Sequence, residues 1–205
     1  YMAVANKGGW LYLYDRATHR LIAREETARH ENVGVPPTTA GLHVCPGTLG
    51  GTEWNGPALD PVDKLIFVDT VDWCVTLTRQ SATRNNFGGA LKMDPPEKGA
   101  GWLRAFDAVT GAPRWTYHSN APMVAGITPT AGGIVFTGSL DGDLLGFDAR
   151  TGNILYRFNT GGAIAGGVSS YAIAGRQYRA VASGNSSKTI WITKGAPTVI
   201  VFGLP

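Results

Sequence analysis

The chain has 205 residues and a mass of 21.7 kDa, which suits one domain or a part of a larger one. Hydrophobic residues make up 43%, charged residues only 16%, and glycine occurs 28 times. This composition excludes disorder throughout the chain and favours many short strands joined by tight turns. The net charge is +3 without any run of Lys or Arg, which indicates a solvated surface and argues against a nucleic-acid partner. No apolar stretch is long enough to cross a bilayer.

Short apolar runs bounded by Gly, Asp, Asn or Pro recur along the chain, and helical periodicity is almost absent. In chain order the predicted strands include GWLYLYDR (9–16), KLIFVDTV (64–71), GWLRAFDA (101–108), GIVFTGSL (133–140), DLLGFDA (143–149), NILYRFN (153–159), YRAVASG (178–184) and TVIVFGL (198–204). The chain begins and stops inside such runs. We therefore expect it to be a fragment, or a processed part, of a longer protein.

An aspartate followed by a turn recurs in three of these segments. Asp15, Asp107 and Asp148 share one frame in LYDRATHRL, AFDAVTGAPRW and GFDARTGNILY, and the last two are 41 residues apart. In Asp-x-x-Thr-Gly the carboxylate accepts bonds from backbone N–H groups two or three residues on, and Gly supplies a positive φ between antiparallel strands. We expect Trp115, at the end of the second copy, to be largely buried between neighbouring sheets. The alternative is a set of coincidental hairpins.

A period of about 40 to 50 residues with four strands per unit is typical of a β-propeller. The sequence therefore predicts an all-β fold, a partial arc of about three and a half to four four-stranded antiparallel blades. Within residues 1–205 the blade-like units are expected at about 1–30, 48–120, 121–162 and 163–205, with an insertion at 79–101.

The repeated motif resembles the tryptophan-docking motif of quinoprotein alcohol and sugar dehydrogenases, whose eight-bladed propellers hold pyrroloquinoline quinone (PQQ). The stretches LHVCPGTLGGTEWNGPALDPVDKLIFVDTVDWC, PMVAGITPTAGGIVFTGSLDGDLLGFDARTGNILYRFNTGG and SYAIAGRQYRAVASG look like successive C-terminal blades of that family. The resemblance covers essentially the whole chain. It implies about half of a propeller, from a periplasmic enzyme that uses PQQ and calcium to oxidise an alcohol, sugar or polyol.

The resemblance also implies partners and limits. The remaining blades of the same protein would complete the ring, and a cytochrome or a quinone would accept the electrons. The family's catalytic Asp and metal ligands belong to earlier blades, so this segment alone is expected to be inactive. A different class of function is a non-catalytic propeller of the same kind that acts as a scaffold or assembly protein.

Site residues follow from the resemblance position by position. Lys7, in ANKGGWLYLYD, matches the family position where a cation bonds the quinone carbonyl oxygens and polarises the reacting carbonyl. A lysine beside Gly-Gly is otherwise a solvated turn residue. The stretch GGTEWNGPALDP matches a cofactor-lining segment, which implies roles for Glu53, Trp54 and Asn55. Glu53 stands where many members have Asn, and a carboxylate faces the quinone tricarboxylate poorly unless a cation intervenes.

Three further residues belong to the implied site. Val124 falls where some members carry a Trp near the quinone, and Gly184 and Asn185 lie in ASGNSS, the loop expected beside the substrate cavity. The alternative for the stretch at Trp54 and Asn55 is a purely structural start of a strand.

Cys45 and Cys74 are the two cysteines of the chain, and they lack partners at zinc-like spacing. Adjacent antiparallel strands of one blade would bring them within bridging distance. A disulfide would persist in the oxidising compartment that the resemblance implies. The alternative is two buried, unpaired thiols.

Overall fold

The computed structural model describes residues 1–80, 89–184, 187, 191 and 193–203. Within these ranges strands dominate, and the helical content is one short 3-10 turn, η1 (Pro96–Lys98). No helix in this part of the chain has the length and apolar character needed to span a membrane.

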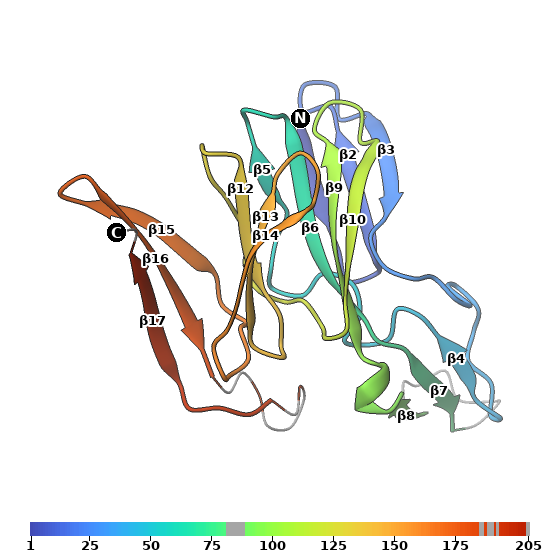
Figure 1. Cartoon of the computed structure of the whole chain (residues 1–205). Helices are drawn as coiled ribbons and strands as arrows, with labels where there is room; N and C mark the ends of the chain where they lie inside the picture. The colour runs from blue at the N-terminus through green and yellow to red at the C-terminus, as the bar shows by residue number, and fades with distance from the viewer. Residues whose placement is uncertain (81–88, 185–186, 188–190, 192, 204–205) are drawn as a thin grey trace.

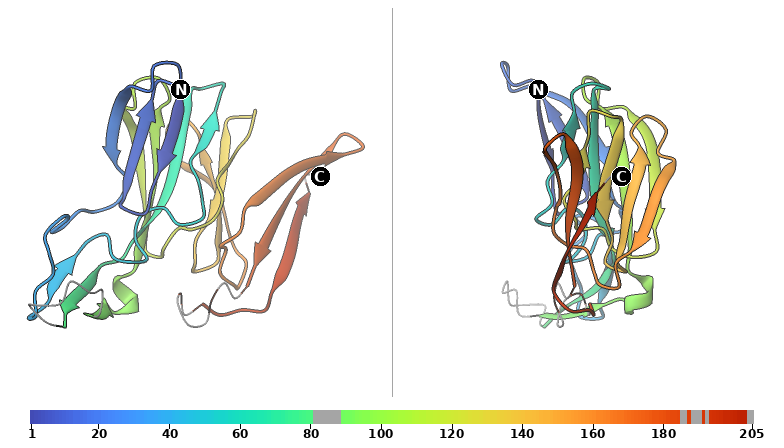
Figure 2. Two further views of the ribbon diagram at one scale, coloured as in Figure 1. Left: turned by 180° about the vertical axis from the view of Figure 1, so that it is seen from behind. Right: turned by 60° about the vertical axis from the view of Figure 1, so that its left-hand side comes forward.

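Four antiparallel sheets follow one another along the chain (Figures 1 and 2). The first contains β1 (Met2–Ala5), β2 (Trp10–Tyr14) and β3 (Leu21–Glu26). The second has the order β10-β9-β6-β5 and contains β5 (Ala58–Asp60), β6 (Leu65–Asp72), β9 (Ala100–Asp107) and β10 (Pro113–Ser119). The third contains β11 (Thr128–Pro129), β12 (Ile134–Gly138), β13 (Asp143–Asp148) and β14 (Ile154–Asn159), and the fourth contains β15 (Val168–Ile173), β16 (Arg176–Ser183) and β17 (Thr198–Gly203). The all-β prediction of a partial arc of antiparallel blades is confirmed.

A small fifth sheet was not predicted from the sequence. It has the order β4-β7-β8 and consists of β4 (Leu42–Val44), β7 (Val75–Arg79) and β8 (Gly89–Met93). The segment 79–101, expected as an insertion, thus supplies β8, η1 and the first residues of β9. Cys45 and Cys74 form a disulfide beside this sheet, with a Cα–Cα distance of 4.6 Å. Val44 pairs with Val75, so the two cysteines are the next residues along the same antiparallel pair.

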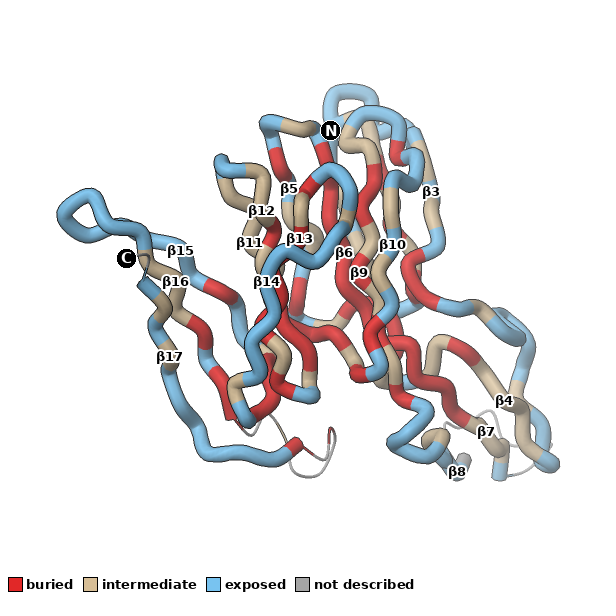
Figure 3. The backbone as a smooth tube through the Cα atoms, viewed as in Figure 1, coloured by how far each residue is buried: buried red, intermediate tan, exposed pale blue. Residues whose placement is uncertain are grey.

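Strand β6 is buried along its whole length because a sheet covers each of its two faces (Figure 3). Its side chains alternate, as in any strand. Leu65 and Phe67 pack into a core with Leu145 and Phe147 of the third sheet. The intervening residues of β6 pack against the first sheet instead, in a second core formed by Leu11, Leu13, Ile66, Val68 and Phe106. A strand covered on both faces carries apolar side chains at successive positions, which explains the run LIFV.

The three aspartate turns have one geometry. Asp107 Oδ1 accepts N–H bonds from Val109 at 2.9 Å and Thr110 at 2.8 Å. Asp15 and Asp148 accept the equivalent pairs in their own turns. These bonds favour the ionised carboxylate and lower the pKa of all three aspartates, with a contribution at Asp107 from the Arg114 guanidinium.

Trp115 connects the second sheet to the third. Its indole N–H donates to the Ala149 carbonyl oxygen at 2.9 Å, and its ring stacks 6.1 Å from Phe147. The ring lies over Gly152, where an added Cβ would come within 2.7 Å of the indole and where φ is +73°. The turn glycine of one repeat therefore provides the flat surface for the aromatic side chain of the preceding repeat. Trp115 is half-buried. The side chain packs against the core between the second and third sheets, as expected for a residue between neighbouring sheets.

The contact between Trp115 and the third sheet predicts a large effect of truncation. Trp115→Ala should lower the free energy of unfolding by about 3 kcal/mol, the low end for a large aromatic residue because the ring is half-buried. Tyr156 occupies the equivalent position one repeat later and is 40% exposed, so Tyr156→Ala serves as a matched control with a smaller loss. Denaturant unfolding of both variants measures the difference. Equal losses would contradict the role given to Trp115.

The disulfide predicts a redox-dependent stability. Reduction opens a link between residues 29 apart in sequence and should cost about 3–4 kcal/mol by the chain-entropy relation. Mass spectrometry should show two hydrogens more after reduction, and thermal melting should shift down only in the reduced sample. Complete labelling of both thiols in denaturant without reductant would disprove the bridge.

Candidate functional site

The residues that the sequence singles out lie at one end of the sheets. In a four-stranded antiparallel meander, the entry to the first strand and the connection between the second and third strands lie at the same end. Lys7 lies between β1 and β2, the stretch 53–55 and Val124 precede β5 and β11, and Gly184 follows β16. The aspartate turns lie at the opposite end, which is uppermost in Figure 1.

Lys7 and Glu53 form an ion pair across 46 positions of sequence. The backbone brings them together: the Thr52 N–H donates to the Asn6 carbonyl oxygen at 3.1 Å. Gly51 has a φ of +72°, and a side chain there would collide with the Lys7 carbonyl group. Side-chain exposure is unequal, 53% for Lys7 and 12% for Glu53. The ammonium group therefore reaches solvent while the carboxylate is mostly enclosed.

Trp54 extends from the second sheet toward the fourth. Its side chain is exposed, and its indole N–H donates to the Ala165 carbonyl oxygen at 2.9 Å. The ring makes an edge contact with Trp191, with ring centroids 6.1 Å apart, and Trp191 in turn lies 6.4 Å from Trp73. Three indoles thus follow one another, from the exposed Trp54 to the buried Trp191 and Trp73.

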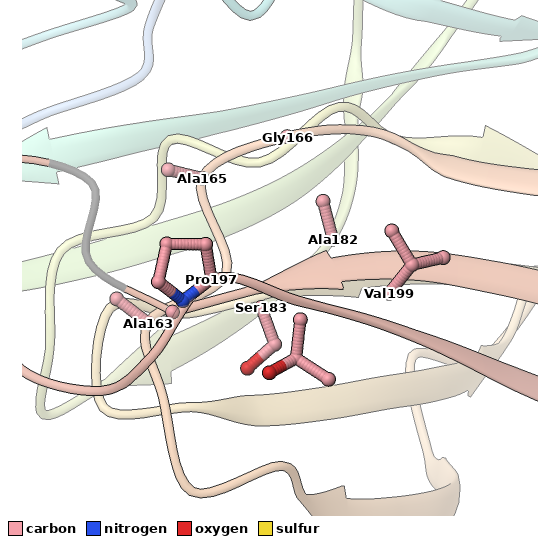
Figure 4. Close-up of a pocket in the computed structure, with 9 residues that line it drawn as sticks. Ala163, Ala165, Gly166, Ala182, Ser183, Pro197 and Val199 are labelled. Carbon is pink, nitrogen blue, oxygen red and sulfur yellow. The ribbon is translucent and has the colours of Figure 1, made fainter.

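A cavity of about 340 Å³ lies at Ala165, the residue whose carbonyl oxygen accepts the Trp54 hydrogen bond (Figure 4). Its wall is made of small side chains, backbone and two hydroxyl groups: Ala163, Ala165, Gly166, Ala182, Ser183, Gly184, Pro197, Thr198 and Val199. Ala165 belongs both to this wall and to the hydrogen bond with Trp54. The structure thus places Gly184 in the wall of this cavity, and Asn185 lies outside the described residues.

Val124 and Asn55 are buried, unlike Lys7 and Trp54. Val124 is completely buried, in a core that also contains Val71, Trp73 and Trp191. It lies beneath the site, as support for the indoles. Asn55 is 4% exposed, and its side chain points into the second sheet rather than out of the site.

Both the oxygen and the nitrogen of the Asn55 carboxamide form hydrogen bonds within the protein. Its oxygen accepts the Glu53 backbone N–H at 3.0 Å. Its Nδ2 donates to the Asp69 carbonyl oxygen at 3.1 Å and to the Asp69 carboxylate. The second carboxylate oxygen of Asp69 accepts the Thr137 hydroxyl of β12 at 3.0 Å. A chain of hydrogen bonds therefore runs from the third sheet to the backbone of Glu53.

Asp69 is a buried acid that sequence reasoning did not select. It continues the alternation of Leu65 and Phe67, so its carboxyl group faces the third sheet. Burial raises the pKa of Asp69 to about 7, against hydrogen bonds from Asn55 and Thr137 that lower it. The sequence does contain a signal for this residue, because Asp69 stands within an apolar run. A strand covered on both faces buries every side chain of such a run.

His43 lies between two carboxylates near the disulfide. Glu31 Oε1 is 3.0 Å from Nδ1 and Asp94 Oδ2 is 3.2 Å from Nε2, and these hydrogen bonds raise the pKa of His43. Among the described residues, His43, Cys45 and Cys74 bring ligand atoms within 4.8 Å of one another. Both sulfurs belong to the disulfide, so this cluster offers no thiolate to a metal ion.

Comparisons with known proteins agree with this architecture. Residues 99–195 match the family described as outer membrane protein assembly factor BamB. Lupanine 17-hydroxylase [cytochrome c] of a Pseudomonas species is 32% identical over 88% of this chain and 29% of its own length. Quinoprotein alcohol dehydrogenase PedH of Pseudomonas putida is 26% identical over 89% of this chain and 35% of its own. A solved europium-containing methanol dehydrogenase superposes with a TM-score of 0.72 at 26% identity, over 89% of this chain and 36% of that one.

The chain spans about a third of the length of these relatives. The described site is thus one part of a larger ring in the proteins that it resembles. Lys7, Glu53 and Trp54 lie outside the stretch matched by the assembly-factor family.

The raised pKa of Asp69 predicts a pH-dependent stability. The folded protein keeps a proton on Asp69 up to about pH 7, whereas the unfolded chain releases it near the ordinary aspartate pKa of 3.8. Between these values the folded state binds more protons, so the free energy of unfolding falls as pH rises, by at most about 1.4 kcal/mol per pH unit. Denaturant unfolding at several pH values within this window measures the slope.

Asp69→Asn is the control for this measurement, because it keeps the shape and removes the titration. Other groups also titrate, including His43, so the relevant quantity is wild type minus variant at each pH. This difference should decrease as pH rises toward 7. Parallel profiles for the two proteins would contradict a raised pKa at Asp69.

Proposed function

Because this chain is similar to quinoprotein alcohol dehydrogenase PedH over 89% of its length, we propose that it forms one side of a PQQ pocket. The whole protein would oxidise an alcohol, sugar or polyol. The observation that carries the proposal is the convergence of an exposed ammonium, an exposed indole and a cavity at one end of the sheets. These are Lys7, Trp54 and the cavity beside Ala165.

The donor set fits a flat, anionic cofactor. Lys7 supplies a half-exposed positive charge, and Trp54 supplies an exposed aromatic ring within the same group of connections. Glu53 cancels the charge of Lys7, so the fit to a tricarboxylate depends on a metal ion that restores positive charge. We propose calcium, with a lanthanide as the other choice, and metal ligands outside this segment.

Bound PQQ would supply a carbonyl carbon that accepts hydride. Lys7 would place its ammonium where negative charge develops on the carbonyl oxygen. Trp54 would form part of the wall, held by its bond to the Ala165 carbonyl oxygen. Val124 would support the wall from beneath, and Asn55 would hold the backbone of Glu53 rather than touch the cofactor.

The protein around this segment would include the remaining blades, the catalytic Asp and the metal ligands. A cytochrome or a quinone would accept the electrons, and we propose a periplasmic location. The Cys45–Cys74 disulfide supports that location, because such bonds persist in oxidising compartments.

A scaffold or assembly function is the second candidate, favoured by the family that matches residues 99–195. That match covers β9 and β10, the third sheet and part of the fourth, where the repeat supplies the fold. A scaffold has no need for a lysine held by a glycine-dependent backbone contact at Gly51. Cofactor binding therefore separates the two functions.

The test is a titration of PQQ into the full-length apoprotein with calcium or a lanthanide, followed by absorbance. Lys7→Ala should weaken binding about tenfold, since a charge-assisted contact is lost. Glu53→Gln should tighten binding, because Lys7 is then no longer neutralised. Lys7→Arg, which keeps the positive charge, is the matched control and should bind close to wild type.

Absence of binding by the wild-type protein with either metal would overturn the enzyme proposal and favour the scaffold. Equal affinities for wild type, Lys7→Ala and Glu53→Gln would show that PQQ binds elsewhere.

A further inference from the structure

We propose that Asp69 is a positioning residue for the site: acting through Asn55, it fixes the backbone that carries Glu53 and Trp54. The inference rests on the proposed function for its consequence in cofactor binding. The mechanical link itself depends only on the hydrogen bonds of this chain.

The link is continuous and has few alternatives. The Asn55 Nδ2 donates to both the carboxylate and the carbonyl oxygen of Asp69, while its Oδ1 accepts the Glu53 N–H. Asn55 and Asp69 are 4% and 1% exposed, so water cannot replace these partners at low cost. Loss of the Asp69 side chain would leave a buried amide donor without its carboxylate partner.

Asp69 also connects the loop of Glu53 and Trp54 to the third sheet. Thr137, which is completely buried in β12, donates to the other carboxylate oxygen at 3.0 Å. Asp69 lies on β6, where side chains on both faces are packed, and its backbone pairs with Leu103 of β9. The buried strand β6 therefore holds the Asp69 carboxyl group in place. Through Asn55, this keeps Glu53 in position to pair with Lys7.

A purely structural role makes a different prediction. In that case Asp69 would stabilise the contact of the second and third sheets through Thr137, and the loop would follow the overall stability. The two partners of Asp69 allow these roles to be separated, because Asn55 leads to the site and Thr137 leads only to β12.

The experiment uses four variants of the full-length protein: Asp69→Val, Asp69→Asn, Asn55→Ala and Thr137→Val. Asp69→Val removes both bonds. Asp69→Asn keeps an oxygen for Asn55 and an amide for Thr137, and is the conservative rescue. Asn55→Ala cuts the path to the site, and Thr137→Val cuts the path to the third sheet alone.

Hydrogen–deuterium exchange of the amides of residues 52–56 is the first measurement, made without cofactor. Asp69→Val and Asn55→Ala should accelerate exchange there about tenfold, the effect expected from losing a buried hydrogen bond. Asp69→Asn and Thr137→Val should exchange close to wild type at these residues. Thr137→Val should still lower the melting temperature.

The PQQ dissociation constant is the second measurement. It should rise about tenfold in Asp69→Val and Asn55→Ala and stay near wild type in Asp69→Asn and Thr137→Val. Unchanged exchange in Asn55→Ala overturns the positioning role, as does equal acceleration in Thr137→Val. If Asp69→Val does not fold, Asn55→Ala and Thr137→Val decide the question.

The two proposals fail separately. If the exchange pattern is as expected but wild type binds no PQQ, the positioning role stands and the cofactor assignment falls. If PQQ binds and Asn55→Ala does not change the exchange of residues 52–56, the cofactor assignment stands and the positioning role falls.

Discussion

The burial of β6 on both faces is the constraint on which the rest of the structure depends. Its side chains point alternately toward the first and third sheets, so one strand contributes to two cores. Each fully buried Leu, Ile, Val or Phe contributes about 1.5–3 kcal/mol relative to exposure. The neighbouring sheets are thereby held at fixed positions on each side of it, and the connections at the ends of these sheets inherit those positions.

The polar residues of β6 form hydrogen bonds with residues on both sides of the second sheet. Thr70 donates to the Thr27 carbonyl oxygen on the side of the first sheet, and Asp69 bonds Thr137 on the side of the third. A buried carboxyl group is costly unless it is hydrogen-bonded. Its two partners, Asn55 and Thr137, reduce that cost. Asn55 also accepts the Glu53 N–H and so connects the core to the loop of Glu53 and Trp54.

The sequence predicted those features that depend on neighbouring residues. The turns at Asp15, Asp107 and Asp148 form through bonds that span two or three residues, so a short motif contains all of their physics. Alternating and continuous apolar runs gave the strands. Cys45 and Cys74 could be placed near one another because strands adjacent in one unit meet. The sheet β4-β7-β8 was not predicted, because its strands are short and are separated by connections without a periodic pattern.

The sequence by itself determined the all-β class, the repeat and the turns, and it singled out Lys7, Glu53 and Trp54 by resemblance. Only the tertiary structure decided that Asn55 turns inward, that Val124 packs beneath the indoles, and that Asp69 bonds both Asn55 and Thr137. The reason is the range of the interactions: Trp54 meets Ala165 across 111 positions, and Asp69 meets Thr137 across 68. Local propensity has no access to such contacts, since they exist only once the sheets have packed against β6.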